Sequence, residues 1–402
     1  MKLLSAQFRH YKSLASVSVT LNPRVTVIVG PNAVGKSNFV DALRFLRDAA
    51  RDDLDHAIVA RGGLTRIRQT STNRPFNVSM SINTLQSFAD SPQQQASYAI
   101  EIASASAGNY RVESEIASCF EESQVQVSDG DKPRLGLFSS GFTRDKNGMI
   151  QETGITRQKP IQFGDPDRLA LGRSSPDFFA SAYGAELHQY ISQWRFSALY
   201  PITLRQLTTP DTDSALREDG SNWASVIRAA KRTPRGRQTL ERINEMMRVV
   251  LPDFLEVSVS TVGSYLVPRF KFGLDDKSVR EFDPVQLSDG TLRIFGILLS
   301  LYQTPAPSLM IVEEPEQTVH PGVLAMLAEA FKEVSEVTQV IVTTHSPQLI
   351  DHFDPENIRV VTMEAGLTSI APIKSSQKEA VKRGLMTLGE FMAAEGLQPE
   401  NT

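Results

Sequence analysis

The 402-residue sequence predicts an α/β fold with a mostly parallel, helix-covered sheet, an N-terminal antiparallel β part and an inserted α+β and helical subdomain. Three observations lead to this prediction. A buried strand, a glycine-containing loop and a helix follow one another near the N-terminus. Strand–helix–strand repetition, which makes parallel sheets, returns in the last third of the chain. Apolar residues make up 41% and charged residues 22%, which excludes wholesale disorder.

The first strand and the first helix are predicted between residues 24 and 50. Residues 24–29 form a β-branched run between two proline-containing turns, Asn22-Pro23 and Gly30-Pro31, which is typical of a buried strand. The apolar residues that follow recur at helical spacing: Phe39, Ala42, Leu43, Leu46, Ala49 and Ala50.

The middle of the chain differs in composition from both ends. Residues 90–175 are rich in Ser, Gln and Gly, which predicts an antiparallel β insertion with long loops. Residues 211–254 are helical in pattern and basic, with the cations Arg228, Lys231, Arg232, Arg235, Arg237, Arg242 and Arg248. Residues 57–89 contain no acid and hold Arg61, Arg66, Arg68 and Arg74. Each basic segment is interpreted either as a solvated face or as a surface for DNA or a partner.

The last third predicts three further strands and a helix. The strands cover residues 309–312, 340–344 and 358–362, and the helix covers residues 323–337. No sustained heptad appears anywhere, so a long coiled-coil arm is not expected.

Charge and cysteine content narrow the class of protein. The formal net charge is −4, which argues against a chain coated in phosphate-neutralising cations. The single cysteine, Cys119, excludes a disulfide framework and a cysteine-based zinc site. No stretch approaches the roughly 18–20 apolar residues of a membrane helix, and no signal peptide is apparent. We therefore expect a cytoplasmic protein without a membrane partner.

Residues 30–37 fit the phosphate-binding loop pattern G-x-x-x-x-G-K-[ST]. Its glycines, Gly30 and Gly35, let the backbone N–H groups point at the phosphates of ATP. Lys36 would reach the β- and γ-phosphates, and Ser37 would give its hydroxyl to Mg²⁺. The strand before and the helix after are the context that this motif requires. The other residues expected to bind ATP are Asn32, Asn38 and Lys12.

Two acids and a histidine follow predicted strands. Glu313 and Glu314 end the strand at 309–312, where ligands of doubly wound sheets collect. The first acid would hold Mg²⁺ through water, and the second would polarise the attacking water. Alone, such a pair is usually a solvated turn. His345 ends the strand at 340–344 and would be structural in isolation, but a shared sheet edge brings it near the same phosphate.

A serine–glycine loop precedes the helical run after residue 290. Ser288 is a plausible helix N-cap, which would account for it unaided. A serine hydroxyl and the N–H of Gly290 at a helix N-terminus are also what binds a γ-phosphate. Leu287 and Thr291 flank this loop.

These four motifs, in this order, resemble those of the ATP-binding-cassette ATPases. The closer likeness is to the RecF/SMC branch, including ATPase parts of the overcoming-lysogenization-defect family and related antiphage ATPases. Residues 8–13 and the phosphate loop look like the N-terminal segment of proteins of that branch, and residues 287–290 match their signature loop. Residues 313–316, His320-Pro321 and His345 match its acidic strand end and switch histidine.

The resemblance implies an ATPase head split between residues 1–85 and 285–402, with residues 86–284 inserted. It implies that two copies form a homodimer or higher oligomer around ATP, with Ser288 and Gly290 of one capping the γ-phosphate held by the other. Glu314 would be the general base, and His345 would contact the γ-phosphate. Glu313 stands where many such ATPases have aspartate. Gln69 would be a further magnesium ligand, although an ordinary surface glutamine explains it better.

The sequence predicts the biological role of the protein less directly than its ATPase activity. The stretch between Lys36 and Ser288 is too short for the arms of chromosome-organising members, and the residues after 362 are too few for a nuclease domain. We therefore expect a regulatory switch for a separate effector, a nuclease, in bacterial antiphage defence, with double-stranded DNA as a candidate cue. The alternative is an ATPase of DNA repair or recombination. A transporter motor and a non-hydrolysing scaffold fit the sequence less well.

Overall fold

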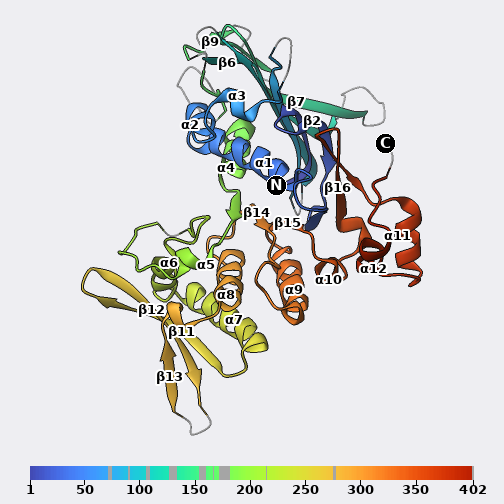
Figure 1. Cartoon of the computed structure of the whole chain (residues 1–402). Helices are drawn as coiled ribbons and strands as arrows, with labels where there is room; N and C mark the ends of the chain where they lie inside the picture. Colours follow the sequence, from blue (N-terminus) through green and yellow to red (C-terminus); the bar gives the residue numbers. More distant parts are fainter. Residues whose placement is uncertain are drawn as a thin grey trace.

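The computed structural model describes residues 1–70, 75–88, 91–105, 109–125, 134–153, 160–165, 167–171, 182–213, 215–274 and 278–400. The strands form an eight-stranded, a six-stranded and a three-stranded sheet. The six-stranded sheet lies between the other two (Figure 1). In the described part of the chain, no helix is long and apolar enough to cross a membrane.

The six-stranded sheet is the mostly parallel sheet that the sequence predicts. Its order is β10-β14-β15-β3-β16-β17, and only the β16–β17 pair is antiparallel. The bounds are β10 (Arg195–Ser197), β14 (Leu309–Glu313), β15 (Gln339–Thr344), β3 (Val25–Val29), β16 (Ile358–Glu364) and β17 (Leu367–Pro372). The four predicted strands are confirmed, while β10 and β17 were not predicted. The carboxyl ends of β14, β15 and β3 meet at one edge, because Glu313 pairs with Thr343 and Thr344 with Val29.

Apolar side chains cover both faces of this sheet. Met310 and Val312 of β14 pack into one hydrophobic cluster, whereas Ile311 packs into the other. Successive strand residues point to opposite faces, so a strand buried on both sides must be apolar throughout. This explains the unbroken β-branched run of β3.

The eight-stranded sheet is antiparallel, in the order β2-β1-β4-β5-β6-β7-β8-β9. The bounds are β1 (Lys2–Tyr11), β2 (Leu14–Thr20), β4 (Val78–Phe88), β5 (Ser91–Ser104), β6 (Tyr110–Val125), β7 (Arg134–Asp145), β8 (Met149–Thr153) and β9 (Ile161–Gln162). The strands expected between residues 90 and 175 occur, and they extend the N-terminal sheet through the β4–β5 pair. The division of the chain near residue 85 stays a prediction, but β4 spans that position.

Helices cover the sheets on the two sides. On the side of the antiparallel sheet, α1 (Lys36–Arg51) contacts α2 (Leu54–Val59) and α4 (Ala182–Ser192), and α3 (Leu64–Ile67) follows α2. On the opposite side lie α5 (Pro201–Leu204), α6 (Trp223–Ala230), α7 (Pro234–Val250), α8 (Asp289–Leu301) and α9 (Leu324–Val334). Helices α10 (Pro347–Ile350), α11 (Ser375–Lys382) and α12 (Leu388–Ala394) lie near the C-terminus (Figure 1). The predicted helix at 323–337 corresponds to α9.

The three-stranded sheet joins α6 and α7 to α8. Its strands are β11 (Phe254–Val262), β12 (Tyr265–Gly273) and β13 (Val279–Phe282), all antiparallel. The basic stretch at residues 228–248 therefore lies on α6, α7 and the turn between them. Part of its charge is neutralised within the chain, because Arg242 pairs with Glu333 and Arg248 with Glu241.

Candidate functional site

The phosphate loop is held in a curled conformation at the edge of the parallel sheet. Gly35 has φ +104°, and a Cβ at this position would collide with the side chain of Thr368, so glycine is required. A Cβ at Gly30 would lie 2.6 Å from the carbonyl oxygen of Val361. Lys36 Nζ donates to the carbonyl oxygens of Gly30, at 2.7 Å, and Pro31, at 2.9 Å. The loop thus wraps around the first residue of α1, whose side chain is only 5% exposed.

Two adjoining cavities lie at this loop. The first, of about 140 Å³, is lined by Asn32, Ala33, Gly35, Lys36, Ser37, Asn38 and Glu314. The second, of about 200 Å³, is lined by Ser37, Ala198, Tyr200, Arg293, Glu313, Glu314 and Gln317. Ser37 and Glu314 line both, so the structure brings the phosphate loop and the two acids together around one space.

Glu313 and Glu314 point to different partners. Glu314 has φ +42°, and its N–H donates to the carbonyl oxygen of Thr343 at 2.9 Å. Its carboxylate lies between two candidate functional groups, with Oε1 3.5 Å from Lys36 Nζ and Oε2 3.5 Å from His345 Nδ1. Glu313 Oε1 instead lies 2.8 Å from Arg44 Nη2. The two adjacent acids can therefore serve different roles, as the strand alternation predicts.

His345 is positioned by Glu316, which follows the two acids. Glu316 Oε1 accepts hydrogen bonds from Thr344 Oγ1, at 2.6 Å, and from the backbone N–H of His345, at 2.8 Å. His345 Nδ1 lies 3.2 Å from the same Glu316 Oε1, so Glu316 contacts both the backbone and the ring of His345. Glu316 therefore fixes the position of the imidazole beside Glu314.

Sequence analysis missed two arginines that hold the acidic strand end. Arg44 contacts Glu313 and also Glu218, whose Oε2 lies 3.0 Å from Arg44 Nε. Burial opposes the charge of Arg44, but Glu218 and Glu313 outweigh it and hold the pKa of Arg44 above its usual value. Arg293 Nη2 donates to the carbonyl oxygens of Glu313, at 3.2 Å, and Glu314, at 2.9 Å. Burial lowers the pKa of Arg293.

The serine–glycine loop begins α8 and is not part of the lining of either cavity of its own chain. Ser288 is the N-cap of α8 and accepts a hydrogen bond from the N–H of Thr291 at 3.1 Å, so the helix-start interpretation is fulfilled. Gly290 packs against the turn after Glu314, because a Cβ there would lie 2.6 Å from the carbonyl oxygen of Thr318. The carbonyl oxygen of Leu287 accepts from Arg205 at 2.8 Å. Ser288 is exposed and lines neither cavity.

Three other expected site residues are engaged with side chains around α1. Lys12 Nζ lies 2.5 Å from Asp41 Oδ2. Asn38, which lines the first cavity, donates to Ser13 Oγ at 2.7 Å. The Gln69 side chain contacts His10 Nδ1 at 3.0 Å and lines neither cavity. The expected role of Lys12 and Gln69 at the nucleotide therefore has no support from these contacts.

Of the basic residues between 57 and 89, some are paired within the chain. Arg61 pairs with Asp41, at 2.9 Å, and Asp48, at 3.1 Å. Arg68 donates to Ser104 Oγ at 2.6 Å. Arg74 lies outside the described residues.

The donor set fits a magnesium ion held together with phosphates. In the described ranges, no group of three or more His, Cys, Asp and Glu side chains is placed to cage a metal. Mg²⁺ does not need one, because it usually keeps several waters and binds one or two protein oxygens plus phosphate oxygens. Ser37 and Glu313 line the same cavity and are the residues that would contribute those oxygens.

Solved structures with a similar overall architecture include heads of SMC proteins. The head in "Crystal structure of the SmcHead bound to the C-winged helix domain of ScpA" aligns over 94% of this chain and 99% of its own, with a TM-score of 0.54 and 12% identity. An Smc head with an extended coiled coil, in complex with the C-terminal domain of ScpA derived from Pyrococcus furiosus, aligns over 96% and 99%, with a TM-score of 0.53 and 12% identity. At this identity the likeness shows the fold alone.

Individual sequence relatives match only a short stretch of this chain, whereas a protein family matches most of it. The DNA replication and repair proteins RecF of Anaeromyxobacter sp. (strain K) and Anaeromyxobacter dehalogenans are 44% identical over 46 residues, 11% of this chain and only 12% of each relative. The family described as "AAA domain, putative AbiEii toxin, Type IV TA system" matches residues 25–121 and 152–351, which is most of the chain. The chain therefore belongs to this family of AAA domains and has the fold of an SMC-type ATPase head.

Proposed function

We propose that the protein binds ATP with magnesium and hydrolyses it at the joined cavities of the parallel sheet edge. The observation that carries this proposal is the position of Glu314, whose carboxylate lies between Lys36 and His345, 3.5 Å from each. A cation for phosphate, a carboxylate for water and an imidazole meet there.

Each residue has a role that follows from its place. Magnesium-bound ATP supplies the γ-phosphate that is transferred to water. Lys36 and the N–H groups of the loop would hold the phosphates, and the side-chain oxygens of Ser37 and Glu313 would hold the magnesium ion. Glu314 accepts the proton of the attacking water, and His345 orients that water or the γ-phosphate. Arg44 fixes Glu313 in its rotamer.

We further propose that two copies close around the nucleotide. Ser288 and Gly290 begin a helix of 13 residues, and Ser288 is exposed. Neither residue lines the cavities of its own chain, so a second copy is needed to bring their hydroxyl and N–H groups to a phosphate. Closure on ATP and opening on hydrolysis would make the protein a conformational switch.

The role that fits this switch best is control of a separate effector, a nuclease, in defence against phage. The family description names a putative toxin of a type IV toxin–antitoxin system, which supports a defence setting. The short match to RecF proteins supports the alternative, an ATPase that clamps or loads onto DNA in repair or recombination. The two differ in whether double-stranded DNA raises the ATPase rate, which can be measured at two salt concentrations.

The decisive experiment for the ATPase compares the purified protein with its Lys36→Ala variant. We expect magnesium-dependent phosphate release and ATP-dependent dimerisation, seen by light scattering after gel filtration, and we expect both to be lost in the variant. Glu329→Gln, an exposed substitution on α9, is the matched control and should behave as the natural protein. Equal phosphate release by the natural protein and Lys36→Ala would contradict the proposal.

A further inference from the structure

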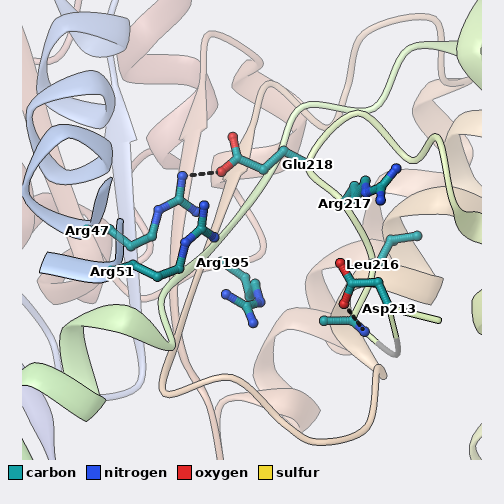
Figure 2. A pocket seen from close by; sticks show the side chains of 8 residues that line it. Arg47, Arg51, Arg195, Asp213, Leu216, Arg217 and Glu218 are labelled. Carbon is teal, nitrogen blue, oxygen red and sulfur yellow. Dashed lines mark hydrogen bonds and ion pairs between the residues drawn. The ribbon is translucent and has the colours of Figure 1, made fainter. Parts of the chain in front are cut away.

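A cavity larger than either of the two at the phosphate loop lies elsewhere in the described chain. It has a volume of about 540 Å³ and lies at the opposite end of α1. Arg47 follows Lys36 by 11 residues, or roughly 16 Å along the helix axis. The cavity is lined by Arg47, Arg51, Arg195, Asp213, Ala215, Leu216, Arg217 and Glu218 (Figure 2). Its volume is within the range of about 300–1,000 Å³ that small-molecule sites occupy.

Four arginines from three parts of the chain line this cavity. Arg47 and Arg51 lie one helical turn apart on α1, so their side chains emerge on the same face. Arg195 comes from the edge strand β10, and Arg217 from the segment before α6. In Figure 2, Arg47, Arg51 and Arg195 lie on one side of the cavity, and Arg217 and Asp213 lie across from them.

The positive charge of the cavity is only partly neutralised. Three of the four arginines have carboxylate partners: Arg47 pairs with Asp48 at 2.6 Å and with Glu218 at 2.5 Å, Arg51 with Asp52 at 2.9 Å, and Arg217 with Asp211 at 2.6 Å. Arg195 has no carboxylate partner in the part of the chain that the structure describes. Its Nη1 reaches only the carbonyl oxygens of Ser192 and Trp194, each at 3.4 Å.

The surroundings of Arg195 disfavour its charge. Burial lowers the pKa of Arg195, and the neighbouring cations Arg51 and Arg47 lower it further, against the opposing effect of Asp213 and Glu218. An anion in the cavity would relieve this repulsion.

A chain of contacts leads from this cavity to the nucleotide site. Glu218 Oε1 lies 2.5 Å from Arg47 Nη2, and Glu218 Oε2 lies 3.0 Å from Arg44 Nε. Arg44 in turn contacts Glu313 at 2.8 Å. The backbone supports the same link, because the carbonyl oxygen of Glu218 accepts from the N–H of Ala198, which lines the second nucleotide cavity.

We propose that this cavity is a second binding site, for a small phosphate-bearing anion, and that its occupant alters magnesium-dependent ATP turnover through Glu218 and Arg44. Guanidinium groups bind phosphate oxygens in a two-pronged geometry, and several of them converge here. The cavity size suits a small phosphorylated molecule rather than a duplex. An anion that draws Arg47 away from Glu218 would shift the Glu218 carboxylate. That carboxylate contacts Arg44, and Arg44 in turn contacts Glu313. The second half of the inference rests on the proposed ATPase function, whereas the first half does not.

The binding half is tested by calorimetry with inorganic pyrophosphate. The titration uses the Lys36→Ala variant without magnesium, so that the phosphate loop contributes little. We expect saturable binding that weakens at least about tenfold when Arg195→Gln or Arg51→Gln is added. Arg51 is 43% exposed, so its variant should fold even if Arg195→Gln does not. The matched control is Arg24→Gln, an exposed arginine that pairs with Glu336 and does not line the cavity, which should leave the affinity unchanged.

Two results would overturn the site. One is no detectable binding of pyrophosphate, and the other is equal affinity in the Arg51→Gln and Arg24→Gln variants. Because no ATP is present, a protein that proved unable to hydrolyse ATP would refute the proposed function and leave this measurement intact.

The coupling half is tested by the steady-state ATPase rate of the natural protein at fixed free magnesium. We expect pyrophosphate to change the rate severalfold and the Glu218→Gln variant to abolish that response while still binding pyrophosphate. Binding at the cavity with no change in rate, or an undiminished response in Glu218→Gln, would refute the coupling.

Discussion

Two glutamates, Glu115 in the antiparallel sheet and Glu314 at the parallel sheet edge, show how differently one side chain can be used. Glu115 is fully buried on β6, and all its lone pairs are directed at protein donors. Its Oε1 accepts from Tyr98 and from the N–H of Leu171, and its Oε2 accepts from the N–H of Ala170 and from Arg144. Burial raises the pKa of Glu115, and these donors oppose that effect.

Glu314 has a strained backbone and few partners by comparison. Its φ is +42°, and its side chain is 20% exposed and lines both nucleotide cavities. Its Oε2 accepts a hydrogen bond from Gln317, and the contacts to Lys36 and His345 are longer, at 3.5 Å. A saturated carboxylate ties strands and loops together, whereas one that is held loosely in a strained turn remains available for chemistry.

The largest effect is expected from Glu314→Gln. Loss of a general base lowers a rate by roughly 10²–10⁴-fold, and ATP binding should persist because Lys36 and the loop are unchanged. The free energy of unfolding should change by less than about 0.5 kcal/mol. Phosphate release measures the expected loss of rate, and urea denaturation measures the free energy of unfolding. A variant that hydrolyses ATP normally would remove Glu314 from the chemistry.

Glu115→Ala should reverse that pattern. Removing one partner of a buried ion pair costs about 3–5 kcal/mol, because Arg144 stays buried without its carboxylate. Turnover per folded molecule should be unchanged, since Glu115 lies in the antiparallel sheet. Denaturant unfolding and the active fraction measure this. If Glu115→Ala were as stable as the natural protein, the contrast between the two glutamates would fail.

Asp41→Asn tests a carboxylate near the site that is nonetheless structural. Burial raises the pKa of Asp41, but Arg61, Lys12 and Tyr11 outweigh it and hold the pKa below its usual value. The charge therefore stabilises the fold above pH about 4, and this stabilisation is lost as pH falls through the lowered pKa. We expect a loss of about 1.5–3 kcal/mol at pH 7.

The difference in unfolding free energy between Asp41→Asn and the natural protein should decrease as the pH is lowered. A gap that stays constant from pH 7 to pH 3 would contradict the assigned cause. Glu379→Gln, which breaks an exposed ion pair with Arg383, is the control and should cost less than about 1 kcal/mol.

Ser288→Ala separates the helix cap from the proposed contact with a second copy. Loss of the N-cap should cost about 1 kcal/mol of unfolding free energy. Thr387→Ala removes a comparable cap on α12 and should cost about the same. Only Ser288→Ala should weaken ATP-dependent dimerisation, measured by light scattering. If both variants dimerised equally, the only role of Ser288 would be that of the helix N-cap, and the proposed contact with a second copy would be refuted.

The smallest effect on stability is expected from charge reversal at Arg235 and Arg237. Both lie on exposed turns of α7, so the unfolding free energy should change by less than about 0.5 kcal/mol. If this face binds DNA, the affinity should fall and its salt dependence should become shallower. Unchanged affinity for DNA would remove this surface as a candidate.

Much of the parallel sheet could be predicted because its signals are local. Residues 25–29 form a β-branched run and residues 309–312 an apolar run because both faces of those strands are covered, and the structure has them in β3 and β14. The edge strand β10 has only three residues, too few for a pattern, and so it was missed. The antiparallel strands after residue 90 were expected, but their attachment to the N-terminal sheet depends on the pairing of β4 with β5.

The sequence by itself predicted the residues of the proposed nucleotide site, since the loop at 30–37, the adjacent acids and His345 each follow a strand that a local apolar run predicts. Only the tertiary structure decided how that chemistry is supported. Arg44 meets Glu313 across 269 positions of sequence, and Arg47, which lies three residues further along the same face of α1, meets Glu218. Such contacts depend on where segments far apart in the chain pack, and no local pattern encodes that.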